Sequence, residues 1–272
     1  MSEWYVLALL FGLLIGSFLN VCIYRMPRDL SVVAPRSFCI ACEKQIVWYD
    51  NIPLLSYFLL GGKCRSCGAP ISWRYPLVEV TTAALFLAAV WRMGPGPEAV
   101  KLCIFCAMMV GLVFMDFEER ILADEFTVGG MIFGFLLSLF LPMPKFIGHF
   151  FLPANWKESY LSLSESLIGG LGPGIVLWGI GELYYRFRGR EGLGFGDVKM
   201  IAAVGAFYGL QGALLTLILG SLSGSLLGLI FIFITKKDAG TYELPFGSFL
   251  GIAAIVPPFL FPEFSGGLVV PW

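Results

Sequence analysis

Long apolar runs separated by short polar segments are the feature that most restricts how this chain can fold. A run of about 20 apolar residues matches the hydrocarbon thickness of a bilayer. Only 14% of the residues are charged, against about 25% in a typical soluble domain, and the mean hydropathy is +0.83. The candidate spans are residues 4–24, 77–93, 98–115, 125–141, 166–185, 199–209, 211–234 and 245–262. We therefore predict an all-α, polytopic membrane protein with about eight transmembrane helices.

Two of these spans are ambiguous from the sequence. Residues 4–24 lack the basic leading region and the small-residue cleavage site of a signal peptide, so we expect them to stay as the first transmembrane helix. The segment 199–209 is short, and only Gly209 and Gln211 separate it from the next span. A count of seven therefore stays open.

The distribution of lysine and arginine predicts the orientation. With eight spans, 14 of the 18 basic residues fall in one set of loops, which is expected to face the cytoplasm. Both termini then lie outside. Residues 25–76 form a cytoplasmic insert between the first helix, residues 1–24, and a helical membrane domain, residues 77–272. The net charge of −1 argues against a nucleic-acid partner, so the lipid bilayer is the expected surrounding.

The cytoplasmic insert contains two C-x-x-C pairs, which are Cys39 with Cys42 and Cys64 with Cys67. Each pair can place two thiolates on one side of a metal, and four cysteines suit a tetrahedral structural zinc site. A disulfide is disfavoured because cytoplasmic thiols stay reduced. A redox role or unused thiols are the alternatives to zinc. Four protein ligands leave no open position for catalysis, so the metal would staple a loop too small to have its own core.

Two acidic residues stand at the ends of apolar runs, where a charge is costly and needs a reason. Asp116 ends one run, and Asp197 lies in a G-x-G-D segment just before another. The predicted topology puts both at the cytoplasmic face, on different helices. Two facing carboxyl groups share one proton and can act on a water as general base and general acid. Gly194 and Gly196 would let backbone approach closely beside them.

A structural interpretation of these acids competes with the catalytic one. Acidic residues cap helix N-termini, and charges mark where helices leave the bilayer. Asp116 and the acids that follow it, up to Glu125, could merely form a solvated loop. The single histidine, His149, falls in an outer loop, so a Ser-His-Asp or Cys-His site at the cytoplasmic face is unsupported.

Taken together, the motifs resemble those of bacterial type IV prepilin peptidases, the bifunctional leader peptidases and N-methyltransferases of pilus and type II secretion systems. The matching pieces recur in the family's order and cover nearly the whole chain. They are Gly16-Ser17-Phe18-Leu19-Asn20-Val21 with Arg25 and Pro27, the paired C-x-x-C, Asn51-Ile52-Pro53 with Ser56, Arg74-Tyr75-Pro76 with Glu79, Asp116 with Asp124, Gly194-Phe195-Gly196-Asp197-Val198-Lys199, and Pro245-Phe246-Gly247.

The resemblance implies roles for particular residues. Asp116 and Asp197 would be the catalytic aspartates, with Asp124 a nearby structural acid and Lys199 a supporting residue. The family often has proline directly before that acid, whereas this chain has Ala123. The four cysteines match the zinc knuckles of the bifunctional members. The donor of the methyl group would be S-adenosylmethionine, and Glu79 and Asn51 are the residues suggested for its site.

The implied function is cleavage of type IV prepilins and pseudopilins at the cytoplasmic face of the bacterial inner membrane. Methylation of the new N-terminus would follow, in support of pilus biogenesis or type II secretion. One alternative is another intramembrane aspartic protease, of the presenilin kind, which would leave the cysteine pairs unexplained. A second alternative is a transporter or scaffold with a zinc-stapled loop. A transporter should show polar residues within its spans and repeated halves, and neither is evident.

Overall fold

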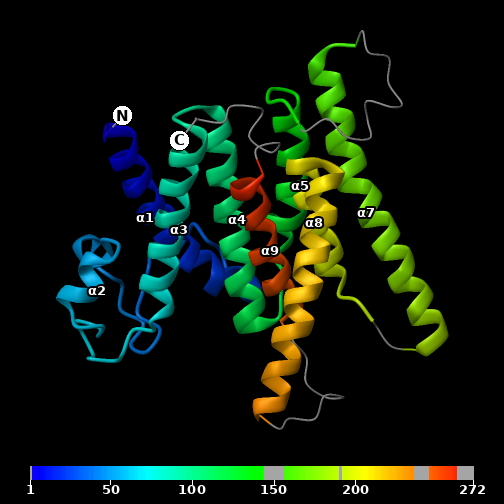
Figure 1. The fold of residues 1–272 in the computed structure, drawn as a ribbon. Helices are drawn as coiled ribbons and strands as arrows, with labels where there is room; N and C mark the ends of the chain where they lie inside the picture. The colour runs from blue at the N-terminus through cyan, green and yellow to red at the C-terminus, as the bar shows by residue number, and fades with distance from the viewer. Residues whose placement is uncertain (1, 144–155, 190–191, 236–244, 262–272) are drawn as a thin grey trace. The chain divides into compact units, whose positions relative to one another are not determined.

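A computed structural model describes residues 2–143, 156–189, 192–235 and 245–261. His149 and half of the predicted outer loop, residues 142–165, lie outside this part of the chain. The described elements are all helical, joined by turns with two isolated bridges (Figure 1). Five helices are long and apolar enough to cross a membrane by length and composition. They are α1 (Ser2–Arg25), α3 (Arg74–Met93), α4 (Pro97–Glu119), α7 (Glu158–Arg188) and α8 (Phe195–Thr235).

The shorter elements fill the segments between these helices. The predicted insert contains two 3₁₀ turns and one short helix, and the remaining two helices each have 15 residues. In chain order they are η1 (Met26–Arg28), η2 (Trp48–Asn51), α2 (Leu55–Leu59), α5 (Asp124–Ser138) and α9 (Phe246–Leu260). Helices α5 and α9 are shorter than the roughly 20 residues that a span requires.

All eight predicted spans fall on helices, but their bounds change. The predicted 98–115 span ends too early, because α4 continues to Glu119 and carries Asp116 within its last turns. The 199–209 and 211–234 spans lie in one helix, α8, which is interrupted by non-helical backbone at Tyr208 and Gly209. Gly209 has φ +70°, which favours glycine. The break lies at the position that the sequence predicts. The number of times that α8 crosses the membrane belongs to the proposed topology.

The chain divides into two compact units, Met1–Gly111 and Leu112–Trp272, and the division falls within α4. In the first unit, α1 packs along α3. A Cβ atom built on Gly12 would lie 2.5 Å from Ala83 Cα, and one on Gly16 would lie 2.7 Å from Glu79 Cα. Such close helix contact requires glycine, as the small-xxx-small spacing of Gly12 and Gly16 predicts.

In the second unit, α8 packs against α5, α7 and α9. A Cβ atom on Gly205 of α8 would overlap the Gly169 carbonyl of α7. On the α9 side, one on Gly220 would lie 2.6 Å from Leu250. The outer faces remain apolar, with large exposed side chains such as Leu222 and Leu226. Helices that are apolar on every side are typical of membrane spans, and the fold is that of a multi-pass membrane protein.

Candidate functional site

The two aspartates predicted to pair lie close together in the second unit. Asp116 comes from α4 and is 6% exposed, and the half-buried Asp197 comes from the first turn of α8. A Cβ atom built on Gly247 would lie 3.0 Å from Asp116 Cγ and 3.1 Å from Asp197 Oδ1. Asp116 Cγ and Asp197 Oδ1 are therefore no farther apart than the sum of these two distances. Helices distant in sequence thus bring both acids to one point, with Gly247 between them.

Ser248, next to Gly247, hydrogen-bonds to Asp116 twice. Its backbone N–H donates to Asp116 Oδ2 at 2.6 Å, and its hydroxyl lies 2.8 Å from the same oxygen. The hydroxyl also lies 3.0 Å from the Val113 carbonyl in α4. Ser248 is the third residue of α9, so Asp116 occupies the positively polarised N-terminus of that helix. The sequence analysis did not identify Ser248 and Gly247 as site residues, although Pro245-Phe246-Gly247 is one of the motifs shared with the family.

The glycines of the G-x-G-D segment also permit close approach. A Cβ atom on Gly194 would lie 3.2 Å from Asp197 Oδ2, and one on Gly196 would lie 3.2 Å from Leu122 Cβ. Leu122 precedes α5, and its Cδ1 would also lie 3.1 Å from a Cβ atom on Gly247. Leu122 is therefore an apolar neighbour on one side of the aspartates, and side chains at these glycines would crowd the site.

Asp124 and Lys199 form an ion pair near this site. The Lys199 ammonium contacts Asp124 Oδ1 and also lies 5.1 Å from the centre of the Phe195 ring. Asp124 is exposed and opens α5, which ties the start of that helix to the first turn of α8. Ala123, where the family often has proline, has φ −63°. That value lies within proline's range, so the backbone conformation here is one that proline would also adopt.

The four predicted metal ligands gather in the first unit. The Sγ atoms of the two cysteine pairs all lie within 4.8 Å of one another. Zn–S bonds of about 2.3 Å in tetrahedral geometry place sulfur atoms about 3.8 Å apart, and Cys39 Sγ lies 3.8 Å from Cys67 Sγ. The cluster could hold a metal ion, and its spacing fits zinc. Cys22 and Cys106 are buried within apolar helices, as packing residues should be.

Both knuckles have the same backbone turn. Cys39 N–H donates to the Lys44 carbonyl at 2.9 Å, and Cys64 N–H donates to the Ala69 carbonyl at 2.8 Å. The residue following each second cysteine, Glu43 or Gly68, has positive φ. In the second knuckle, hydrogen bonds from the Cys67 and Ser66 backbones lower the pKa of the Cys64 thiol to about 7, whereas burial and the three other thiols raise the pKa of Cys67 to about 11. A lowered thiol pKa favours the thiolate, which is the form that binds metal.

The residues suggested for the methyl donor also lie in the first unit. Glu79 is 6% exposed in α3, and its Oε2 accepts a hydrogen bond of 2.8 Å from Leu54 N–H. Asn51 ends η2. Both line a single cavity together with the cysteine-bearing segments.

Comparisons with known proteins identify the family. Residues 10–93 match the model of the bacterial Peptidase A24 N-terminal domain, and residues 103–229 match that of the type IV leader peptidase family. No solved structure matches the chain.

Named relatives match over most of their length. A prepilin leader peptidase/N-methyltransferase of Aeromonas hydrophila is 34% identical over 92% of this chain and 88% of its own. Proteins of the same name from Pseudomonas aeruginosa and Klebsiella pneumoniae are 34% and 35% identical, over 90% and 80% of this chain and 86% and 91% of theirs. With two converging aspartates, four clustered cysteines and this similarity, the chain belongs to the family of prepilin leader peptidase/N-methyltransferases.

Proposed function

We propose that this protein cleaves the leader from type IV prepilins and pseudopilins, then methylates the new N-terminus. The observation that carries the peptidase half is the convergence of Asp116 and Asp197 at Gly247. The methyltransferase half is supported by the names of the relatives. Their sequence similarity to this chain covers both the cysteine-bearing unit and the aspartate-bearing unit. Its role would be in pilus biogenesis or type II secretion.

The two aspartates have different surroundings, and this difference suggests separate roles. The Ser248 N–H donates to Asp116 Oδ2, and the Ser248 hydroxyl lies beside the same oxygen, so Asp116 is held in place as a hydrogen-bond acceptor. Two carboxyl groups this close share one proton, because two like charges at this distance repel. Asp116 would take a proton from water as the water oxygen attacks the scissile carbonyl carbon. Asp197 would give its proton to the leaving amine nitrogen as the C–N bond breaks.

The proposed topology brings substrate to this pair. The 14 basic residues on one set of loops support a cytoplasmic active site in the inner membrane, with eight crossings in which α8 contributes two segments. The helix of a prepilin would lie in the bilayer and its leader in the cytoplasm. The scissile bond would then lie at the membrane face, level with the aspartates.

Zinc and S-adenosylmethionine complete the proposal. Cys39, Cys42, Cys64 and Cys67 would hold the zinc as a structural ion. When bound, S-adenosylmethionine would supply an activated methyl group for the amine of the new N-terminus, and S-adenosylhomocysteine would leave. Glu79 and Asn51 would contribute to its site.

Expression of the chain in a host that lacks a leader peptidase tests the proposed cleavage. A co-expressed prepilin should be converted to a shorter form, as an immunoblot of the membrane fraction reports. Replacing the prepilin by one that lacks its leader provides the size standard. A prepilin that stays at precursor length, with the chain present in the membrane, would reject the peptidase proposal.

Gly247→Ala should reduce cleavage, because the added Cβ would press on both carboxyl groups. A misplacement of about 1 Å can cost about 100-fold in rate, and we expect a fall in kcat of at least about tenfold. Gly129→Ala in α5 is the matched control, since its Cβ meets nothing within 4 Å. Equal cleavage rates for the two variants in purified form would contradict the assigned position of Gly247.

Ser248→Ala should lower kcat about 10- to 100-fold with little change in KM, because one hydrogen bond to a charged group is lost. Ser248→Thr keeps the hydroxyl and should recover most of the rate. Steady-state kinetics on a prepilin peptide in detergent measures both constants. A loss confined to KM, or no recovery in the threonine variant, would argue against a positioning role for the hydroxyl.

A further inference from the structure

Helix α2 of the insert carries apolar side chains on its outer side. Leu55, Phe58 and Leu59 are 52%, 64% and 76% exposed. Their i, i+3, i+4 spacing puts them on one face of the helix, here called the α2 face. Ser56 is buried on the inner side. In a soluble domain the apolar face of a helix packs on the core, so the reverse orientation of α2 indicates an interaction surface.

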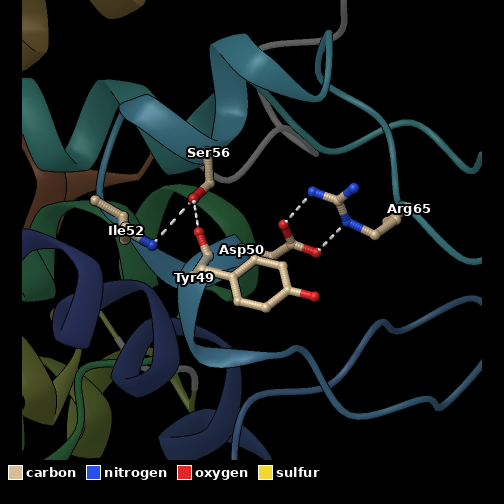
Figure 2. Close-up of polar contacts among 5 residues, drawn as sticks. All are labelled: Tyr49, Asp50, Ile52, Ser56 and Arg65. Carbon is tan, nitrogen blue, oxygen red and sulfur yellow. Dashed lines mark hydrogen bonds and ion pairs between the residues drawn. The ribbon is translucent and has the colours of Figure 1, made fainter.

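Hydrogen bonds hold α2 in this orientation (Figure 2). The Ser56 hydroxyl donates to the Tyr49 carbonyl at 2.8 Å and accepts from the Ile52 N–H at 3.1 Å. The Arg65 guanidinium donates two hydrogen bonds of 2.7 Å to the Asp50 carboxylate, which joins the second knuckle to the same turn, η2. The inner side of α2 is therefore fixed to η2, and α2 cannot turn its apolar face inward without breaking these bonds.

The position of α2 along α3 indicates what covers the α2 face. Leu54, the residue before α2, donates its backbone N–H to Glu79 Oε2 at 2.8 Å. Glu79 lies five residues after Arg74, the first residue of α3, which is about 7.5 Å along a helix axis. Figure 1 shows α2 level with the first half of α3 rather than beyond its end. Because α3 is long and apolar enough to cross the membrane, α2 begins within the surface layer of the bilayer.

The surroundings of α2 have the composition of a membrane interface. Trp73 directly precedes α3, is 72% exposed, and has its ring centre 5.5 Å from that of Tyr57 in α2. Tryptophan and tyrosine are enriched where membrane proteins pass the headgroup level. Residues 51–73 contain Lys63 and Arg65 but no acidic residue. Such a segment suits a surface that carries anionic lipids.

We propose that α2 is an interfacial helix, with the α2 face in the boundary between lipid headgroups and acyl chains on the side of the membrane where α3 begins. Interfacial apolar faces enter this boundary by about 5–10 Å, which agrees with the depth that the hydrogen bond between Leu54 and Glu79 indicates. The insert is then held to the bilayer by α1 and α3 at its ends and by α2 between them. The cysteine knuckles therefore stay at the membrane surface.

Photocrosslinking to lipid tests this contact in vesicles that contain the full chain. The vesicles consist of phosphatidylethanolamine and phosphatidylglycerol, with a small share of a phospholipid that carries a photoreactive diazirine on its acyl chain. Trypsin then places α2 in the peptide 45–63 and the first knuckle in the peptide 37–44. We expect lipid on residues 55–59 and none on 37–44, although Ile40 in the latter is 55% exposed.

Two double variants show whether apolar side chains make the contact. Phe58→Asp with Leu59→Asp should lower the lipid yield on α2 several-fold, because carboxylates are costly among acyl chains. Phe58→Leu with Leu59→Phe is the matched control, since it exchanges two apolar side chains at the same positions and should keep the yield. Each yield is divided by that on Leu222 and Leu226, which are exposed on α8. Zinc content reports whether the insert remains folded.

The outcomes decide between lipid and other occupants of the α2 face. Lipid on α8 but not on residues 55–59 of the wild-type chain would overturn the proposal, as would an unchanged yield in the folded aspartate variant. The yield should stay constant when a prepilin is added, and a loss would assign the face to the substrate instead. If the aspartate variant loses its zinc, the wild-type yields decide. Neither cleavage nor methyl transfer enters these measurements, so the result is independent of the proposed function.

Discussion

Asp116→Asn and Asp197→Asn are each expected to abolish prepilin cleavage while the protein remains in the membrane. Asparagine keeps the size of the side chain, but it can neither take a proton from water nor give one to the leaving amine. General acid and base groups each contribute about 10²- to 10⁴-fold in rate, and both steps depend on this pair. Cleavage of a purified prepilin in detergent, followed over time by gel electrophoresis, measures the loss.

Glu182→Gln is the matched control for these two variants. Glu182 belongs to the same unit, but its side chain is 38% exposed and pairs with Arg186, one turn further along α7. Surface pairs of this kind contribute about 0–1 kcal/mol to stability, so cleavage should stay near the wild-type rate. Activity in Asp116→Asn or Asp197→Asn close to that of Glu182→Gln would refute the assignment of the aspartate pair.

Replacing Cys39 and Cys42 together by serine should remove the bound zinc and unfold the insert. Zinc binding supplies about 10–16 kcal/mol in small zinc domains. The insert between α1 and α3 has few other supports, since it contains only short turns and the five-residue helix α2. Metal analysis of the purified wild-type protein should give about one zinc per chain, and the double variant close to none. Limited proteolysis should then cut within residues 26–73.

Cys103→Ala provides the control for the cysteine experiment. Cys103 and Cys106 share the C-x-x-C spacing, but they lie in α4 and outside the group of four. Zinc content should therefore be unchanged in this variant. If the double serine variant also retains its zinc, the four cysteines do not form the metal site.

The charged and thiol-bearing site residues were predictable because each can be recognised from its immediate neighbours in the sequence. A charge at the end of an apolar run is energetically costly, and the spacing of paired cysteines is visible directly. Asp116 and Asp197 are acids at the ends of apolar runs, and the paired cysteines have metal-ligand spacing. The structure brings the members of each set together. The break in α8 was predictable for a similar reason, because Gly209 separates two apolar runs.

Other features of the fold and the site depend on tertiary packing, which no local sequence pattern reveals. Ser248 is a small polar residue in an apolar run, and only the placement of α9 beside α4 makes it a partner of Asp116. The cavity is formed by residues between 17 and 79, from helices and turns whose arrangement no periodicity reveals. The end of α4 at Glu119 was missed because hydropathy stops at Asp116, whereas the helix continues with polar residues.

Mass spectrometry of a purified prepilin, incubated with the wild-type protein and S-adenosylmethionine, tests the central claim most directly. The account predicts a product that has lost the leader and carries one added methyl group on its new N-terminus. The Asp197→Asn variant should yield neither change. A prepilin that keeps its full mass with the wild-type protein, or one that Asp197→Asn cleaves as the wild type does, would contradict the account.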